Sequence, residues 1–189
     1  RAATLFRSAD LIFCLDFNDL KRIDRTAPMV EESRAPRVVV DHHLNPLIEA
    51  DVLISHPEVS STCALLFQLC EALGIDSALT PDAAMCCCTG MMTDTGNFSY
   101  NSNDPQLYRI LARLVATGID KDAIYTRLFN TNSEQRVRIM GYGQSSKLQI
   151  LREHQAALIT LSYEELQRFG YHRGDTEALV NVPLSIPGI

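Results

Sequence analysis

Two short apolar segments, each ending in an acidic residue, constrain the fold of this chain more than any other feature. Residues 11–15 read LIFCL and lead directly into Asp16. Residues 37–40 read RVVV and lead into Asp41, His42 and His43. Continuous apolar runs of this length are typical of strands buried on both faces, as in a parallel sheet. The two runs therefore predict neighbouring strands of an α/β domain.

The rest of the chain predicts helices around that sheet. Polar, helix-compatible residues 20–33 join the two runs, which indicates a βαβ unit. Capping residues then mark the starts of five further helices, at Ser61 or Thr62, Thr80, Asp104, Asp120 and Ser133. We expect an α/β fold with a mostly parallel sheet flanked by helices over residues 1–130. A connecting helix over 131–150 and the start of a smaller α/β domain over 151–189 should follow.

Composition narrows the range of partners. The 189 residues carry a net charge of −6, which disfavours wide electrostatic capture of long nucleic acid. A small phosphorylated substrate held by metal ions stays compatible, because the ions bring their own positive charge. No apolar run approaches the roughly 20 residues that cross a bilayer. The six cysteines form no CxxC pair of the kind found in zinc sites. We therefore expect the cysteines to be small core residues of a cytoplasmic protein, where thiols stay reduced.

Three groups of polar side chains are candidates for chemistry. Asp16 and the Asp41-His42-His43 triplet should share one rim, because ligands of open α/β sheets bind beyond the carboxyl ends of the strands. Asp94 follows a helix of small residues and stands in a Thr-Asp-Thr-Gly segment. Three carboxylates and two imidazoles suit Mn²⁺ or similar divalent ions. Two such ions about 3.5–4 Å apart can neutralise a phosphoryl group and activate water.

Each group also has an ordinary structural explanation. A single Asp at the end of a strand is most often a turn or cap residue, and Thr-Asp-Thr-Gly is a plausible turn. Two adjacent histidines after a buried strand are harder to explain by packing, since neighbouring side chains do not share one face. The occurrence of all three groups in this order favours a metal site.

The order Leu15-Asp16, then Asp41-His42-His43 after an apolar strand, then Asp94 in its Thr-Asp-Thr-Gly segment resembles the DHH phosphoesterase superfamily. The segment Ser60–Thr62 and the pattern after residue 150 resemble its DHH–DHHA1 branch of oligoribonucleases and pAp (3′,5′-bisphosphate nucleotide) phosphatases. The resemblance extends over nearly the whole chain. It implies a hydrolase that acts on short oligonucleotides or pAp, and it allows a homodimer.

The resemblance also implies roles for individual residues. A pair of Mn²⁺ ions is expected, with Asp16 bridging both and with His42 and Asp94 binding one of them. His43 would touch the scissile phosphate, and Asp41 would orient the cluster from behind, as carboxylates commonly do for metal-bound histidines. Substrate contacts are expected from His43 and from two hydroxyl groups, those of Ser61 and Thr62.

Two family features are missing from this sequence. No His-x-x-x-Asp-x-Asp strand precedes Asp16, and no glycine-rich, histidine-containing loop precedes Ile189. We therefore expect a piece of a longer enzyme that by itself binds one Mn²⁺ weakly and hydrolyses little.

Four other functions compete with this interpretation. The main alternatives are a cyclic-dinucleotide phosphodiesterase and a nucleotide-binding domain without catalysis. An inorganic pyrophosphatase would have a different second domain. A processive exonuclease would have a more basic surface.

Overall fold

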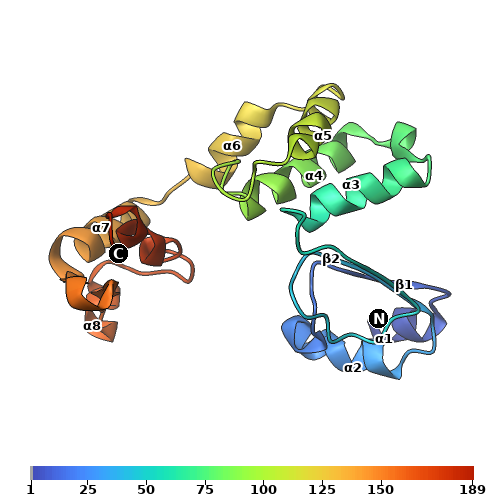
Figure 1. The fold of residues 1–189 in the computed structure, drawn as a ribbon. Coiled ribbons are helices and arrows are strands. Elements are labelled where there is room, and N and C mark those ends of the chain that lie inside the picture. Colours follow the sequence, from blue (N-terminus) through green and yellow to red (C-terminus); the bar gives the residue numbers. More distant parts are fainter. Residues whose placement is uncertain (1) are drawn as a thin grey trace. The chain divides into compact units, whose positions relative to one another are not determined.

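The computed structural model describes residues 2–189. The chain divides into two compact units, one reaching to Leu128 and the other spanning Phe129–Ile189 (Figure 1). The first unit contains the sheet and the helices packed around it. The second contains a small hairpin with short helices. The predicted candidate site residues all lie in the first unit.

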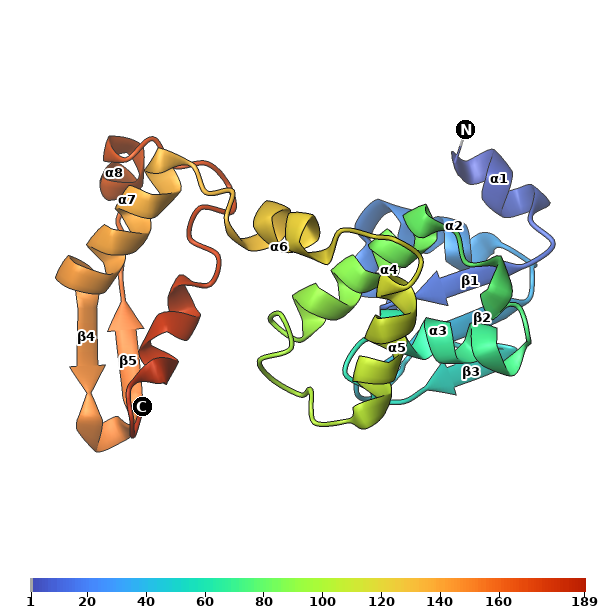
Figure 2. The same ribbon diagram turned by 90° about the horizontal axis from the view of Figure 1, so that it is seen from above.

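A three-stranded parallel sheet organises the first unit. Its strands are β1 (Ile12–Leu15), β2 (Arg37–Asp41) and β3 (Val52–Ser55), in the order β1-β2-β3 (Figure 2). The α/β class and the two predicted strands are confirmed. We did not predict β3, although its three apolar residues equal the run in β2, because a run of this length does not by itself distinguish a strand from a loop.

One face of the sheet is closed by the segment that joins β1 to β2. This segment forms a 3₁₀ helix (Leu20–Thr26) followed by α2 (Ala27–Glu32), and α1 (Ala2–Ser8) precedes β1. Asp24 interrupts the helical backbone with a φ of 42°, so the connection is two short helices rather than one. The buried core on this face consists of Ile12, Cys14, Val30, Val39 and Ile48.

Four helices complete the first unit: α3 (Thr62–Ala72), α4 (Pro81–Asp94), α5 (Pro105–Val115) and α6 (Lys121–Phe129). Their caps are as predicted, since the side chains of Ser61, Thr80 and Asp104 each accept a bond from a first-turn backbone N–H. Helices α3, α4 and α5 pack together, and Figure 2 shows them side by side. Their shared core includes Cys88, Met91, Met92, Leu107, Ile110 and Leu114.

The second unit begins with the helix predicted after Ser133. Helix α7 (Glu134–Tyr142) continues as one π-helical turn (Gly143–Lys147) and then gives way to β4 (Leu148–Leu151). The helical segment is therefore shorter than residues 131–150. Two glycines weaken its last turns, and the alternating burial of the following residues suits a strand.

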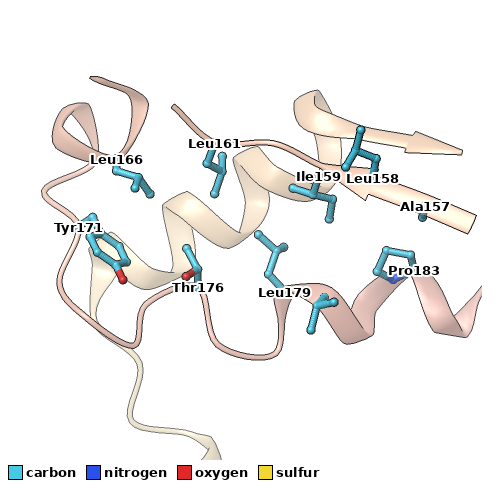
Figure 3. A pocket seen from close by; sticks show the side chains of 10 residues that line it. Ala157, Leu158, Ile159, Leu161, Leu166, Tyr171, Thr176, Leu179 and Pro183 are labelled. Atoms are coloured by element: carbon cyan, nitrogen blue, oxygen red, sulfur yellow. The ribbon is translucent and has the colours of Figure 1, made fainter. Parts of the chain in front are cut away.

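A hairpin forms the rest of this unit's framework. Strand β5 (Ala156–Ile159) pairs antiparallel with β4. Helix α8 (Tyr163–Arg168) starts with the predicted capping box between Ser162 and Glu165. A final 3₁₀ helix covers Leu179–Ser185. An apolar pocket of about 480 Å³ lies between β5 and this last segment (Figure 3), so the small unit leaves one side of its core open.

The cysteines are only partly core residues. All six are free. Cys14 and Cys88 are buried as expected, but Cys86 is exposed and the other three are half-buried. Helix α4 explains this spread, because consecutive residues 86–88 point in different directions around the helix axis. Within residues 2–189, no helix is long and apolar enough to cross a membrane.

Candidate metal centre

The first component of the site lies where β1 ends. Asp16 follows the strand, and its backbone N–H donates to the carbonyl of Val40 at 3.1 Å, which extends the ladder between β1 and β2. Its φ of 66° lies in the left-handed region, which is uncommon for a residue with a side chain and costs free energy. This conformation ends the strand sharply and places the carboxylate at the sheet's carboxyl edge.

The second component follows β2. The Nδ1 atom of His42 lies 3.2 Å from the backbone carbonyl of Val59. A carbonyl can only accept, so Nδ1 carries the proton and Nε2 keeps its lone pair. That Nε2 atom lies 3.7 Å from Oδ1 of Asp16. The main chain of the β3–α3 connection therefore fixes the imidazole tautomer that can bind a metal.

Asp41 positions the other imidazole. Its side chain is fully buried, and Oδ1 accepts a hydrogen bond of 2.7 Å from Nδ1 of His43. The neighbouring rings of His42 and His43 meet edge to face, with centroids 4.8 Å apart. Because the buried carboxylate accepts from Nδ1–H, Nε2 of His43 stays free for another partner.

The second oxygen of Asp41, Oδ2, is buried and has no hydrogen-bond partner among the described residues. Burying a carboxylate oxygen without a partner costs several kcal/mol unless a positive charge is close. The rim beside Asp41 thus favours a bound cation or a protonated imidazole.

The N-terminus of α3 closes one side of the site. Ser61 and Thr62 are almost completely buried. The Thr62 hydroxyl donates to Oδ1 of Asp16 at 2.8 Å, while the Ser61 hydroxyl accepts from the backbone N–H of Cys63. The structure therefore places Thr62 against a predicted metal ligand, with little of its surface facing solvent.

Asp94 is the last residue of α4. Burial raises the pKa of its carboxyl group, a hydrogen bond from Ser61 lowers it, and the negative charge of Asp16 raises it again. The positive charges of the two histidines, when protonated, lower it. These interactions place Asp94 in the same electrostatic environment as the residues after β1 and β2. A cation at this rim would favour its ionised form.

The turn after Asp94 has little room to vary. Gly96 has a φ of 52°, and a side chain there would meet the ring of Tyr100 at 2.3 Å. The buried Thr95 hydroxyl donates to the carbonyl of Met91 and accepts from the N–H of Phe98. This turn ends α4 and anchors Asp94.

Side chains from two strand ends thus converge. The possible ligand atoms of Asp16, His42 and His43 all lie within 4.8 Å of one another, and they form the one such group found within residues 2–189. Sequence reasoning placed all three residues at this rim but missed the contribution of Val59, which acts through its main chain. No side-chain pattern could have signalled that contact.

The donor set fits a divalent ion. One carboxylate and two imidazole nitrogens with free lone pairs suit Mn²⁺, Zn²⁺ or Fe²⁺ better than Ca²⁺, which prefers oxygen ligands. The unpaired buried oxygen of Asp41 adds negative charge behind these donors.

Comparisons with known proteins agree with this geometry. The family described as "DHH family, N-terminal domain" matches residues 2–119, which is more than half of the chain. The chain belongs to the DHH family. Its Asp41-His42-His43 triplet is the segment whose buried carboxylate and paired imidazoles build the site described above.

Two relatives of this DHH-family chain show how far the similarity extends. An exopolyphosphatase-related protein from Bacteroides fragilis has a solved structure that matches with a TM-score of 0.96 and 46% identity, over 100% of this chain and 55% of that one. The bifunctional oligoribonuclease and PAP phosphatase NrnA of Thermus thermophilus is 30% identical over 90 residues, which are 47% of this chain and 27% of that protein. The chain thus spans about half or less of these relatives' lengths.

Proposed function

We propose that this chain supplies the metal-binding core of a phosphoester hydrolase. The convergence of Asp16, His42 and His43 within 4.8 Å carries the proposal. Membership of the DHH family and the similarity to a bifunctional oligoribonuclease and phosphatase support it. A nucleotide-binding domain without catalysis would have no need for a carboxylate held at a positive φ beside two imidazoles of defined tautomer.

Asp16 and His42 would hold the metal, and we propose Mn²⁺. We propose Asp94 as a further ligand, although it is not one of the three side chains whose ligand atoms converge within 4.8 Å. Bound there, divalent ions would neutralise phosphoryl oxygens and lower the pKa of water. Asp16 can both accept the Thr62 hydrogen bond and bind a metal, because Thr62 binds Oδ1 and leaves Oδ2 available. The Val59 carbonyl engages Nδ1 of His42, which leaves Nε2 facing Asp16 at 3.7 Å.

His43 is proposed to act on the substrate rather than primarily on the metal. Its Nδ1–H is held by Asp41 at 2.7 Å, so Nε2 can accept a proton or, once protonated, donate a hydrogen bond to a phosphoryl oxygen. Through that hydrogen bond Asp41 holds the His43 ring in one orientation.

Ser61 and Thr62 were expected to contact substrate. Their burial and their hydrogen bonds favour a positioning role instead. Thr62 orients the Asp16 carboxylate, and the Ser61 hydroxyl supports the ionised form of Asp94. In this proposal the start of α3 is the support on which two metal ligands rest.

The substrates proposed for the complete enzyme are short oligonucleotides or pAp. The name of the Thermus relative describes both activities for that protein. The exopolyphosphatase-related title of the Bacteroides relative adds polyphosphate as a comparison substrate. We further propose a cytoplasmic location, in line with six free cysteines. Residues 151–189 are proposed to form part of a DHHA1-like domain, and a homodimer remains our expectation.

Metal binding is the first test. Calorimetric titration of the metal-free chain with Mn²⁺ should show about one bound ion per chain, with Zn²⁺ and Ca²⁺ as comparison ions. Asp16→Asn should abolish this binding. Asp51→Asn is a matched control, because that carboxylate lies at the opposite end of the sheet, where it accepts from the N–H of Arg37. Equal binding by both variants would contradict the proposed centre.

Hydrolysis is the second test. The chain and the longer Bacteroides relative should be assayed side by side with a labelled dinucleotide, pAp and polyphosphate in Mn²⁺. We expect the relative to turn over at least one substrate, and this chain to do so far more slowly, since it covers 55% of that relative's chain. Failure of the relative on all three substrates would remove the support for hydrolysis.

A further inference from the structure

A pair of thiols lies directly behind the metal centre, at the contact between α3 and α4. The thiol of Cys87 donates to the backbone carbonyl of Cys63 at 3.3 Å. The two side chains also influence each other's titration, since the Cys87 thiol lowers the pKa of Cys63 and Cys63 raises that of Cys87. Both side chains are half-buried, so a small solute can reach them.

Gly90 makes this approach possible. A methyl group at Gly90 would lie 2.3 Å from the sulfur of Cys63, a distance that real atoms do not adopt. Gly90 lies three residues after Cys87, so both face α3 from the same side of α4. Because Gly90 has no side chain, α4 can approach α3 closely. Cys87, about one turn before Gly90 on α4, is then brought close to Cys63 on α3.

The pair is coupled to the site through the chain itself. Cys63 follows Thr62, whose hydroxyl binds Asp16, and the Cys63 backbone N–H is bound by the Ser61 hydroxyl. A displacement of Cys63 would therefore move both residues that we propose as supports for the metal ligands.

A thiolate metal site does not explain the pair. Within the part of the chain that the structure describes, the one group of three converging ligand side chains contains no cysteine. A core role is also insufficient, since neither cysteine is fully buried.

We propose that Cys63 and Cys87 form a reversible redox pair, which a peroxide converts to a disulfide that joins α3 to α4. The Cys63 thiolate attacks one peroxide oxygen, and the O–O bond breaks. With hydrogen peroxide this gives a sulfenic acid at Cys63 and hydroxide, which takes up a proton to become water. The Cys87 sulfur then attacks the Cys63 sulfur, the S–O bond breaks, and the Cys87 proton leaves with the hydroxide as a second water. Both sulfurs are oxidised and the peroxide is reduced.

The environment of the pair distinguishes the two thiols. The neighbouring Cys87 thiol lowers the pKa of Cys63, against the opposing effects of burial and of the Asp94 and Asp16 charges. The nearby Cys63 side chain and burial raise the pKa of Cys87. Cys63 therefore reacts first and Cys87 second.

Disulfide formation should weaken metal binding. The two sulfurs must move from a non-bonded separation to a bond of about 2.05 Å, which draws the start of α3 toward α4. Thr62 then loses its geometry toward Asp16. Disturbing such a supporting contact typically reduces metal affinity by about 10- to 100-fold, and we expect a loss of about 10-fold. This consequence rests on the proposed metal centre, whereas the disulfide itself does not.

The test starts from the reduced, metal-free chain with a chelator present. After treatment with hydrogen peroxide, thiol titration under denaturing conditions should show a loss of two of the six thiols. Chymotryptic digestion without reductant should yield a linked pair of peptides that contain Cys63 and Cys87. Trypsin is unsuitable, because residues 38–108 contain no lysine or arginine. Calorimetry with Mn²⁺ before oxidation, after oxidation and after reduction with a dithiol then measures the coupling.

Matched variants separate this pair from the other cysteines. Cys63→Ala and Cys87→Ala should each abolish the cross-link, while Cys70→Ala should leave it unchanged. Circular dichroism melts of each variant check folding. A cross-link through Cys86, or none at all, would overturn the redox pair. A cross-link with unchanged Mn²⁺ affinity would overturn its coupling to the site. Absence of Mn²⁺ binding in the reduced chain would instead refute the proposed metal centre, with the cross-link result still standing.

Discussion

Removal of the Thr62 hydroxyl gives the most direct test of how α3 supports the metal centre. Thr62→Val keeps the shape of the side chain but deletes the donor that lies 2.8 Å from Oδ1 of Asp16. Thr62 is only 4% exposed, so this hydroxyl has little surface for any other partner. The carboxylate of Asp16 would then sample orientations that do not face the metal.

The expected magnitude follows from the hydrogen bond and its exposure. A hydrogen bond to a charged acceptor contributes roughly 1.5–3 kcal/mol. The Asp16 side chain is 54% exposed, so water replaces part of the lost interaction, and the lower end of the range applies. A loss of about 1.4 kcal/mol corresponds to an approximately tenfold weaker Mn²⁺ affinity.

Calorimetric Mn²⁺ titration of four proteins decides the outcome. Wild type and Thr62→Ser, which keeps a hydroxyl, should bind similarly, and Thr62→Val should bind about tenfold more weakly. Thr89→Val is a matched control, because Thr89 bonds only within α4, to the carbonyl of Met85. The reasoning is refuted if Thr62→Val binds Mn²⁺ as tightly as wild type. A loss confined to substrate affinity in the longer enzyme would instead restore the substrate contact first expected for this residue.

Three further predictions follow from other contacts. Elemental analysis after dialysis against Mn²⁺ should find far less metal in His42→Ala than in His43→Ala, and the reverse order would exchange the roles proposed for the two rings. Hydrogen bonds from Arg109 and Arg113 lower the pKa of Glu71. The ionised Glu71 side chain therefore stabilises the fold at neutral pH, and this stabilisation is lost as the pH falls from the ordinary Glu range through the lowered pKa. Glu71→Gln should therefore cost about 1 kcal/mol near pH 7, a modest figure because the arginines are 41–42% exposed, and its melting curve should converge with that of wild type in acid; a gap that stays constant with pH would contradict this. Gly96→Ala should lower the free energy of unfolding more than Gly118→Ala in denaturant titrations, because both positions have a positive φ but only at Gly96 would a side chain meet an aromatic ring.

Much of the framework could be predicted because its signals are local. The apolar runs before Asp16 and Asp41 predicted two strands of a parallel sheet, and both strands form. Side-chain caps predicted the starts of α3, α4 and α5, since a cap depends on residues two or three positions away. Strand β3 was missed although its apolar run is as long as that of β2, because so short a run is ambiguous by itself and the strand is stabilised by its pairing with β2.

The sequence by itself also determined which side chains could form a site. Strand ends of a parallel sheet meet at one edge, so Asp16, His42 and His43 were expected together, and they converge within 4.8 Å. Only the tertiary structure decided how they are held. The Val59 carbonyl that sets the tautomer of His42, the Thr62 hydroxyl on Asp16 and the Cys63–Cys87 contact all join segments far apart in the chain. Such contacts depend on how α3 packs against its neighbours, and no local periodicity records the distance between two side chains on different helices.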